Sequence, residues 1–84
     1  MRDSVLKGAH TWVKRNIASP ATASFSEESV KRTTDGNYIA VGAVDAQNGF
    51  GALIRNWYIY EMNEDGTPAF GELVQFDPNT SGPE

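Results

Sequence analysis

Residues 37–62 read NYIAVGAVDAQNGFGALIRNWYIYEM, and this stretch decides the fold. It holds two runs rich in β-branched and aromatic residues, Asn37–Ala46 and Ala52–Met62, which is the composition of β-strands. Between them lies Asn48-Gly49, a dipeptide that favours the positive backbone angles of a tight hairpin turn. The stretch therefore predicts two antiparallel strands joined by a short turn.

Weaker signals of the same kind lie on both sides of this hairpin. Residues 24–33 predict an earlier strand, and the Asp-Gly pair at 35–36 predicts the turn that follows it. Beyond residue 62, the Glu-Asp-Gly run at 64–66 predicts a third turn, and Pro68–Phe76 predicts a last strand. Short turns join antiparallel neighbours, so the four runs predict a four-stranded antiparallel meander.

Residues 3–17 predict a helix that precedes the sheet. The apolar residues of this segment recur at steps of three and four, namely Val5, Leu6, Ala9, Trp12, Val13 and Ile17. Asp3 or Ser4 is expected to cap the first N–H groups. Pro20 disfavours helical geometry in the residue before it, so the helix is expected to stop near Ala18.

Together these elements predict an α+β fold, with the N-terminal helix packed on a curved four-stranded antiparallel meander sheet. A chain of this length supports one hydrophobic core, so residues 1–76 are expected to form a single domain. Residues 77–84 have nothing to bury and are expected to form a flexible acidic tail.

The two central strands carry apolar residues on both of their faces, yet only one helix is available to cover them. A two-residue turn at Asn48-Gly49 would place Val44 opposite Leu53 and Gly42 opposite Arg55. With that register one face carries Tyr38, Ala40, Val44, Leu53, Trp57 and Ile59, and the other carries Ile39, Val41, Ala43, Ile54, Tyr58 and Tyr60. A bulge at Gly51 would slip the register and swap these faces. An uncovered apolar face indicates a partner, and a homodimer would bury it.

Composition and charge exclude several kinds of site. The chain has no cysteine, so it has no disulfide, no thiolate metal site and no cysteine nucleophile. The net charge of −4 divides into +3 over residues 1–34 and −7 over residues 35–84, which argues against a nucleic-acid partner. This asymmetry fits a dipolar surface that steers a charged partner, or a basic helix folded back on an acidic sheet. No stretch has the apolar length of a signal peptide or a membrane span, so no membrane insertion is expected.

Two motifs resemble those of a known group of domains. Residues 19–25 fit Ser-Pro-x-Thr-Ala-x-Phe, and residues 44–55 fit Val-Asp-Ala-Gln-Asn-x-Phe-Gly-Ala-x-x-Arg. With these motifs the chain resembles small bacterial and phage domains of unknown function, which are often appended to lipoproteins or zinc-ribbon membrane proteins. The chain lacks their lipid-anchored or membrane-attached N-terminus, so the resemblance implies a free-standing, phage-encoded version. Its expected location is the bacterial cytoplasm, or the soluble part of an exported protein if a longer precursor exists.

The richest polar cluster surrounds the central turn. Asp45, Gln47 and Asn48 offer hydrogen bonds and Phe50 offers an aromatic anchor, as in a recognition loop. The same residues would equally serve to hold the hairpin together. Arg55 is the only basic residue after position 34, and it would either grip the carboxylate or phosphate of a ligand or pair internally, with Asp45 or Glu72.

The remaining polar residues predict no metal or cofactor site. His10 is the only histidine and has no cluster of ligands near it in the sequence, so it is expected at the surface or its boundary. Glu61, Glu64 and Asp65 lack the spacing of a calcium loop and are expected to form a solvated hairpin tip.

From the sequence we expect a small non-enzymatic module that binds a protein partner through the Asn48–Gly51 hairpin or through an uncovered sheet face. The alternative is a phage-encoded inhibitor of a host enzyme or defence complex, whose acidic surface imitates nucleic acid and comprises Glu61, Glu64, Asp65 and Glu72. An enzyme ranks third, because the sequence shows no nucleophile–base pair, metal cluster or cofactor loop. An enzyme would require a concave pocket with a titratable pair near Asp45 or Arg55.

Overall fold

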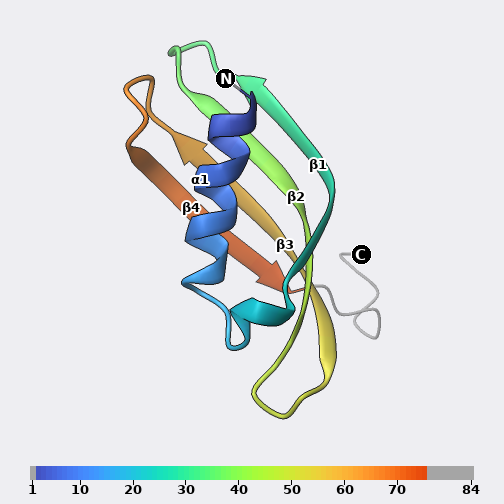
Figure 1. Cartoon of the computed structure of the whole chain (residues 1–84). Coiled ribbons are helices and arrows are strands. Elements are labelled where there is room, and N and C mark those ends of the chain that lie inside the picture. The colour runs from blue at the N-terminus through green and yellow to red at the C-terminus, as the bar shows by residue number, and fades with distance from the viewer. Residues whose placement is uncertain (1, 76–84) are drawn as a thin grey trace.

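A computed structural model describes residues 2–75 of the chain (Figure 1). In chain order, the elements are α1 (Arg2–Lys14), the short 3₁₀ helix η1 (Pro20–Thr22), β1 (Ser24–Arg32), β2 (Tyr38–Gln47), β3 (Leu53–Met62) and β4 (Pro68–Gln75). The strands form one antiparallel sheet in the order β1-β2-β3-β4, and α1 lies across one of its faces. The predicted α+β fold, a helix followed by a meander, is confirmed. The sheet is open, with β1 and β4 at its edges.

The strand boundaries agree with the sequence predictions to within one residue over the described part of the chain. The predicted end of the last strand at Phe76 and the predicted tail, residues 77–84, lie outside the described residues. The smallest dimension of the molecule is 18 Å, which corresponds to one layer of helix on one layer of sheet.

The three hairpins share one loop geometry. In each, three residues separate the closing pair, and the third is a glycine with positive φ: Gly36 at 90°, Gly51 at 85° and Gly66 at 94°. This is a three-residue turn whose last residue forms a glycine bulge, and a side chain at that position is strained. In the central hairpin the amide of Asn48 donates to the carbonyl of Ala52 over 2.8 Å.

The predicted two-residue turn at Asn48-Gly49 is therefore wrong, and so is the register that follows from it. Gln47 pairs with Leu53 and Asp45 with Arg55. The register differs from the predicted one by an odd number of residues. Every side chain of β3 therefore lies on the opposite face from the one predicted, when the faces of β2 are taken as the reference. As a result, the predicted grouping of residues into two faces is wrong. The β2 residues Tyr38, Ala40 and Val44 share a face with Tyr58 and Tyr60 of β3. They do not share it with Leu53, Trp57 and Ile59.

Helix α1 begins and ends earlier than predicted. It starts at Arg2, so Asp3 and Ser4 lie inside its first turn and do not cap it; there Asp3 interacts favourably with the helix dipole. It ends at Lys14, because the amides of Arg15 and Asn16 turn back to carbonyls three residues earlier. The Asn16 side-chain amide also donates to the carbonyl of Trp12 over 2.7 Å, which satisfies an exposed carbonyl of the last turn.

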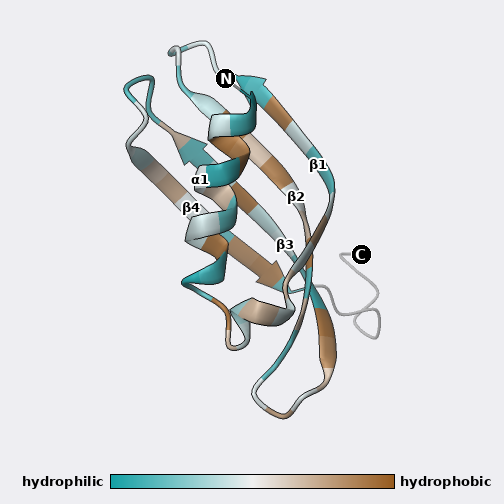
Figure 2. Cartoon of the chain, viewed as in Figure 1, coloured by the Kyte–Doolittle hydropathy of each residue, from teal (hydrophilic) through white to brown (hydrophobic). Residues whose placement is uncertain are grey.

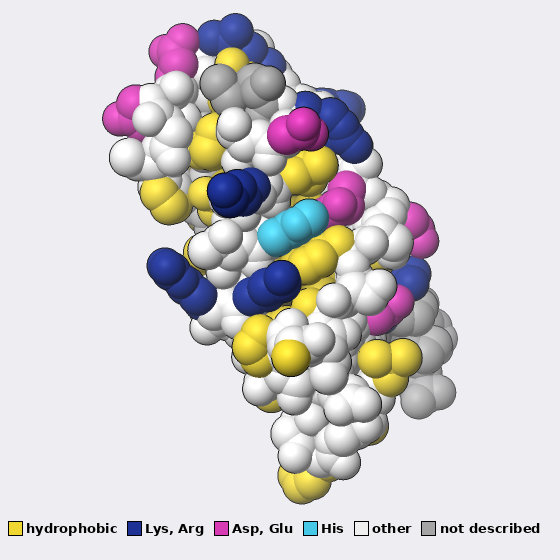
Figure 3. All heavy atoms as spheres, viewed as in Figure 1, with side chains coloured by type: hydrophobic (Ala, Val, Ile, Leu, Met, Phe, Trp, Pro, Cys, Tyr) yellow, Lys and Arg dark blue, Asp and Glu magenta, His cyan; other side chains and the backbone are white. Residues whose placement is uncertain are grey.

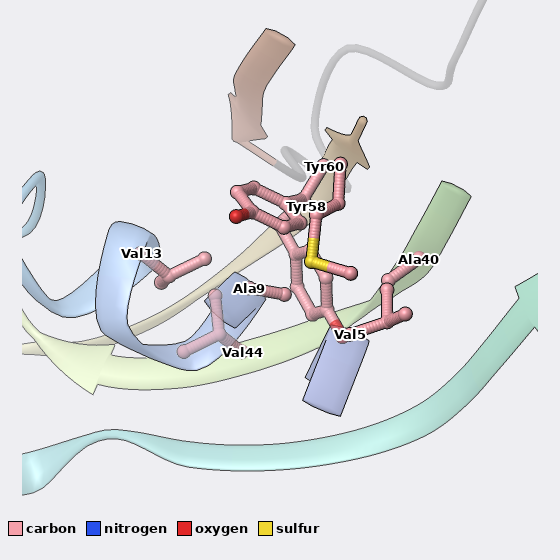
Figure 4. Close-up of a cluster of buried hydrophobic side chains, with 8 residues drawn as sticks. Val5, Ala9, Val13, Ala40, Val44, Tyr58 and Tyr60 are labelled. Atoms are coloured by element: carbon pink, nitrogen blue, oxygen red, sulfur yellow. The ribbon is translucent and has the colours of Figure 1, made fainter. Parts of the chain in front are cut away.

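The core lies between α1 and the sheet (Figure 4). Val5, Ala9 and Val13 project from one face of the helix onto the buried Tyr58 and Tyr60 of β3. The buried cluster is completed by Ala40 and Val44 of the neighbouring strand β2 and by Met62 at the end of β3. Alternation of hydrophobic and hydrophilic residues along α1 in Figure 2 matches this one-sided packing.

Two glycines of the sheet leave room for close contacts, one with a side chain of α1 and one with a side chain of β1. A Cβ on Gly71 would collide with the indole of Trp12, which brings α1 down onto β4. A Cβ on Gly42 would lie 2.7 Å from Cγ of Glu28 and 2.9 Å from Cε2 of Tyr58. Within the described residues no helix has the length and apolar character needed to cross a membrane.

Candidate functional site: the open face of the sheet

The face of the sheet opposite α1 is covered by no element among residues 2–75, and we call it the open face. Strand alternation and register assign its residues: Ser24, Ser26, Ser29 and Lys31 of β1; Ile39, Val41, Ala43, Asp45 and Gln47 of β2; Leu53, Arg55, Trp57, Ile59 and Glu61 of β3; and Phe70, Glu72 and Val74 of β4. Figure 1 views the molecule from the helix side, so this face lies behind the sheet.

Apolar side chains run across the open face from the central strand β2 to the edge strand β4. We call them the apolar strip: Ile39, Val41, Trp57, Ile59, Phe70 and Val74. Phe70 is 51% exposed and Val74 is 48% exposed, although each lies in a regular strand where it could have been buried. Large apolar side chains exposed on one face in this way are typical of a surface that another macromolecule covers.

An ion cluster lies at one end of the apolar strip. Nε of Arg55 donates to Oδ1 of Asp45 over 2.7 Å, and an Nη of Arg55 donates to Oδ2 over 2.9 Å, so the pair is bidentate. The guanidinium also reaches Oε2 of Glu27 at 3.3 Å and lies 6.0 Å from the ring centroid of Trp57. The hydrogen bonds from Arg55 hold the pKa of Asp45 below its usual range, and Asp45 in turn raises the pKa of Arg55.

The expected internal pairing of Arg55 is therefore confirmed for Asp45 and wrong for Glu72. Glu72 lies opposite Ile59, further along the sheet. The bidentate geometry uses both oxygens of Asp45 and leaves the Arg55 side chain 35% exposed on the open face. Arg55 is thus held in one orientation, with part of its guanidinium facing solvent.

A bulge in β1 explains why Glu27 joins this cluster. Residues 27 and 28 together stand opposite Gly42, and Glu27 has φ of 53°. Regular alternation after Ser26 would turn Glu27 to the helix side and Glu28 to the open face. The extra residue breaks this alternation, so Glu27 reaches the open face and Glu28 reaches the helix side. Neither glutamate was predicted as a site residue, since only a two-acid run inside a strand hinted at the bulge.

Glu28 organises a polar network on the helix side. Its Oε2 accepts a hydrogen bond from the hydroxyl of Tyr58 over 2.6 Å and lies 2.5 Å from Nε2 of His10. The His10 ring stacks on Phe25 with centroids 3.8 Å apart, and Figure 3 shows the cyan histidine between a hydrophobic and an acidic side chain. Burial and the bond to Glu28 raise the pKa of Tyr58. This network joins α1 to β1 and β3, and it places His10 at the boundary of the core.

The hairpin between β2 and β3 extends the open face beyond the end of α1 (Figure 1). Oδ1 of Asn48 accepts hydrogen bonds from the amides of Phe50 and Ala52, at 2.9 and 3.0 Å, so Asn48 holds the loop. The Phe50 side chain is 97% exposed at the tip. Of the predicted binding residues, Asn48 therefore stabilises the loop. The exposed side chains of Gln47 and Phe50 are available to contact another molecule.

Most of the acidic residues of the alternative hypothesis are engaged within the chain. Glu64 pairs with Arg32 at 3.1 Å, and Glu61 accepts a hydrogen bond from the side-chain amide of Asn37 over 2.9 Å. Asp65 accepts from the amide and hydroxyl of Thr67, and these bonds lower its pKa. Glu72 is exposed on the open face. Three of the four acids thus bind groups of their own chain.

The best-formed hollow of the described surface lies on the helix side. It measures about 530 Å³ and lies between α1 and the hairpin that joins β3 to β4, with Trp12, Tyr60, Met62 and Pro68 among its lining residues. Neither Asp45 nor Arg55 lines it. Among residues 2–75, no three histidine or acidic side chains are close enough to share a metal ion.

Comparisons with protein-family models, with curated proteins and with solved structures found no match to this chain. The geometry of the open face is therefore the basis for inferring a function. It combines an exposed apolar strip with a fixed, partly exposed cation, which is a combination suited to protein contact.

Proposed function

We propose that this chain is a small non-enzymatic protein-interaction module, of the bacterial or phage kind suggested by its motifs, and that it binds its partner through the open face and the tip of the β2–β3 hairpin. One observation carries the proposal: Phe70 and Val74 are about half exposed on a face that no described element covers. Burial of such side chains is the main favourable contribution to protein association.

The charge arrangement supports the same proposal. Aromatic and arginine side chains are enriched at the centres of protein interfaces, and the open face holds Trp57, Phe70 and Arg55. Arg55 is already oriented by Asp45 and Glu27, so little side-chain entropy is lost when a partner contacts it. The acidic inhibitor is less well supported, because three of its four acids are engaged within the chain.

Affinity capture tests this proposal. A tagged wild-type chain is used as bait in a lysate of the source cell, and untagged chain is added to the same lysate. The bound proteins are then washed a second time at about 1 M salt, where the Debye length falls to about 3 Å. We expect the captured protein to remain bound at high salt, because apolar contact dominates. Val74→Ser and Phe50→Ala should each reduce capture, since Phe50 contributes only its backbone amide to the loop.

Lys14→Ser is the matched control, because Lys14 is exposed at the end of α1, on the opposite side of the sheet. Capture that Val74→Ser leaves unchanged would contradict the proposal. Capture that is lost at high salt, and that neutralisation of Glu72 weakens, would instead favour the acidic inhibitor.

A further inference from the structure

The open face has the size of a small self-complementary interface. Four strands about 4.8 Å apart, each contributing about eight residues of about 3.3 Å, give about 500 Å² for each copy, or about 1,000 Å² for a pair. This area lies at the lower limit of specific interfaces, so a dimer formed by it would be weak and concentration-dependent. Two sheets packed face to face at about 10 Å would form a sandwich with the helices on the outside.

Two exposed charges at opposite edges of the open face determine how two copies would be oriented. Lys31 lies on β1 and Glu72 lies on β4, and neither makes an ion pair with any residue in the described range 2–75. Lys31 stands in the row of Ile39, Glu61 and Phe70, and Glu72 lies two residues from Phe70 on the same face. Along the strand direction the two charges are therefore offset by two residues, or about 7 Å.

A twofold axis that runs along the strands would place β1 of each copy over β4 of the other. Lys31 of each copy would then lie over Phe70 of the partner copy, with the partner's Glu72 two residues away and within reach of the long lysine side chain. A twofold interface repeats every contact, so this pair would form twice in one dimer. An axis at right angles to the strands would instead place each β1 over the partner's β1 and each β4 over the partner's β4. That arrangement would leave Lys31 and Glu72 on opposite edges and without each other, so the axis along the strands is favoured.

We propose that the occupant of the open face is a second copy of this chain, in a face-to-face homodimer whose twofold axis follows the strands and whose Lys31 and Glu72 side chains pair between copies. This inference rests on the proposed function, because it names the partner of the same surface. The apolar strip provides the buried centre of the dimer, and the cluster around Arg55 lies toward its rim.

Sedimentation equilibrium from about 10 μM to about 1 mM tests the dimer, in the range expected for a weak interface. We expect reversible dimerisation of the wild-type chain, and none for Val74→Asp. Lys31→Glu replaces two attractive contacts with two repulsive ones and should weaken association by about tenfold. The double variant with Lys31→Glu and Glu72→Lys should restore it, which also shows that the altered chain folds.

Lys14→Glu changes the net charge by the same amount on the helix side and should leave association unchanged. The dimer is contradicted if the wild-type chain is monomeric throughout, or if Lys31→Glu dimerises as well as the wild type. A monomeric chain whose capture of another protein is lost in Val74→Ser would overturn the dimer and leave the proposed function standing.

Discussion

At the scale of single residues, the pair formed by Asp45 and Arg55 suits the open face to the proposed protein contact. An unpaired arginine beside an apolar strip would lose water on binding without compensation, whereas this one already has a bidentate partner at 2.7 and 2.9 Å. Asp45 and Arg55 are directly opposite each other in the β2–β3 register, so the pair also stabilises the central hairpin.

The lowered pKa of Asp45 predicts a pH-dependent contribution to stability. The folded state binds this proton less readily than the unfolded chain does. The contribution is therefore fully present above the unfolded value near 4, and is lost as the pH falls through the lower folded pKa. Asp45→Asn should lower the free energy of unfolding at pH 7, and its difference from the wild type should shrink in acid.

Urea unfolding at several pH values between neutral and acid measures this difference. Asp35→Asn is the control, because Asp35 is exposed in the β1–β2 loop and makes no ion pair within the described part of the chain. A deficit of Asp45→Asn that persists unchanged in acid would contradict the role given to the pair.

Sequence reasoning could find part of this cluster and not the rest. Arg55 is the only base among fifty residues that carry eight acids, so an acidic partner was predictable from composition. Glu27 was not, because it reaches Arg55 only through a bulge in β1. A bulge depends on how the whole strand pairs with its neighbour, and no local run of residues specifies it.

At the scale of elements, loop geometry decides which side chains share a face. The three hairpins use the same three-residue loop, with its final glycine at positive φ. Existence and order of the strands were predictable, since each turn contains glycine beside Asp or Asn. The register of the central hairpin was not, because residues 48–52 contain two glycines and either could have formed the turn.

The two glycines of this loop provide a direct test of the register. Gly51 has φ of 85°, whereas Gly49 lies outside the positive-φ region, and an added Cβ would meet open space at both positions. Gly51→Ala should therefore lower the free energy of unfolding by about 1 kcal/mol or more, through backbone strain alone. Gly49→Ala should change it by less than about 0.5 kcal/mol.

Chemical denaturation of the two variants measures the difference. The opposite order, with Gly49→Ala the more damaging, would indicate a two-residue turn at Asn48-Gly49. It would also exchange the two faces of one strand, and with them the assignment of the open face.

At the scale of the whole molecule, one helix covers one face of a four-stranded sheet. A helix of 13 residues reaches all four strands, and it does so at β4 through the contact of Trp12 with Gly71. The sequence already showed more apolar strand residues than one helix can cover. In the structure the uncovered ones include those of the apolar strip. Which residues form the strip could be known only once the register was known.

The two tryptophans of the chain lie on opposite faces, which makes them reporters of binding. Trp12 packs on the helix side and Trp57 belongs to the open face. The most direct measurement is a series of ¹H–¹⁵N NMR spectra of the wild-type chain at increasing concentration, in which each indole N–H is followed. We expect the Trp57 signal to shift as copies associate, while the Trp12 signal stays in place. A shift of Trp12 without one of Trp57, or no shift of either, would contradict association through the open face.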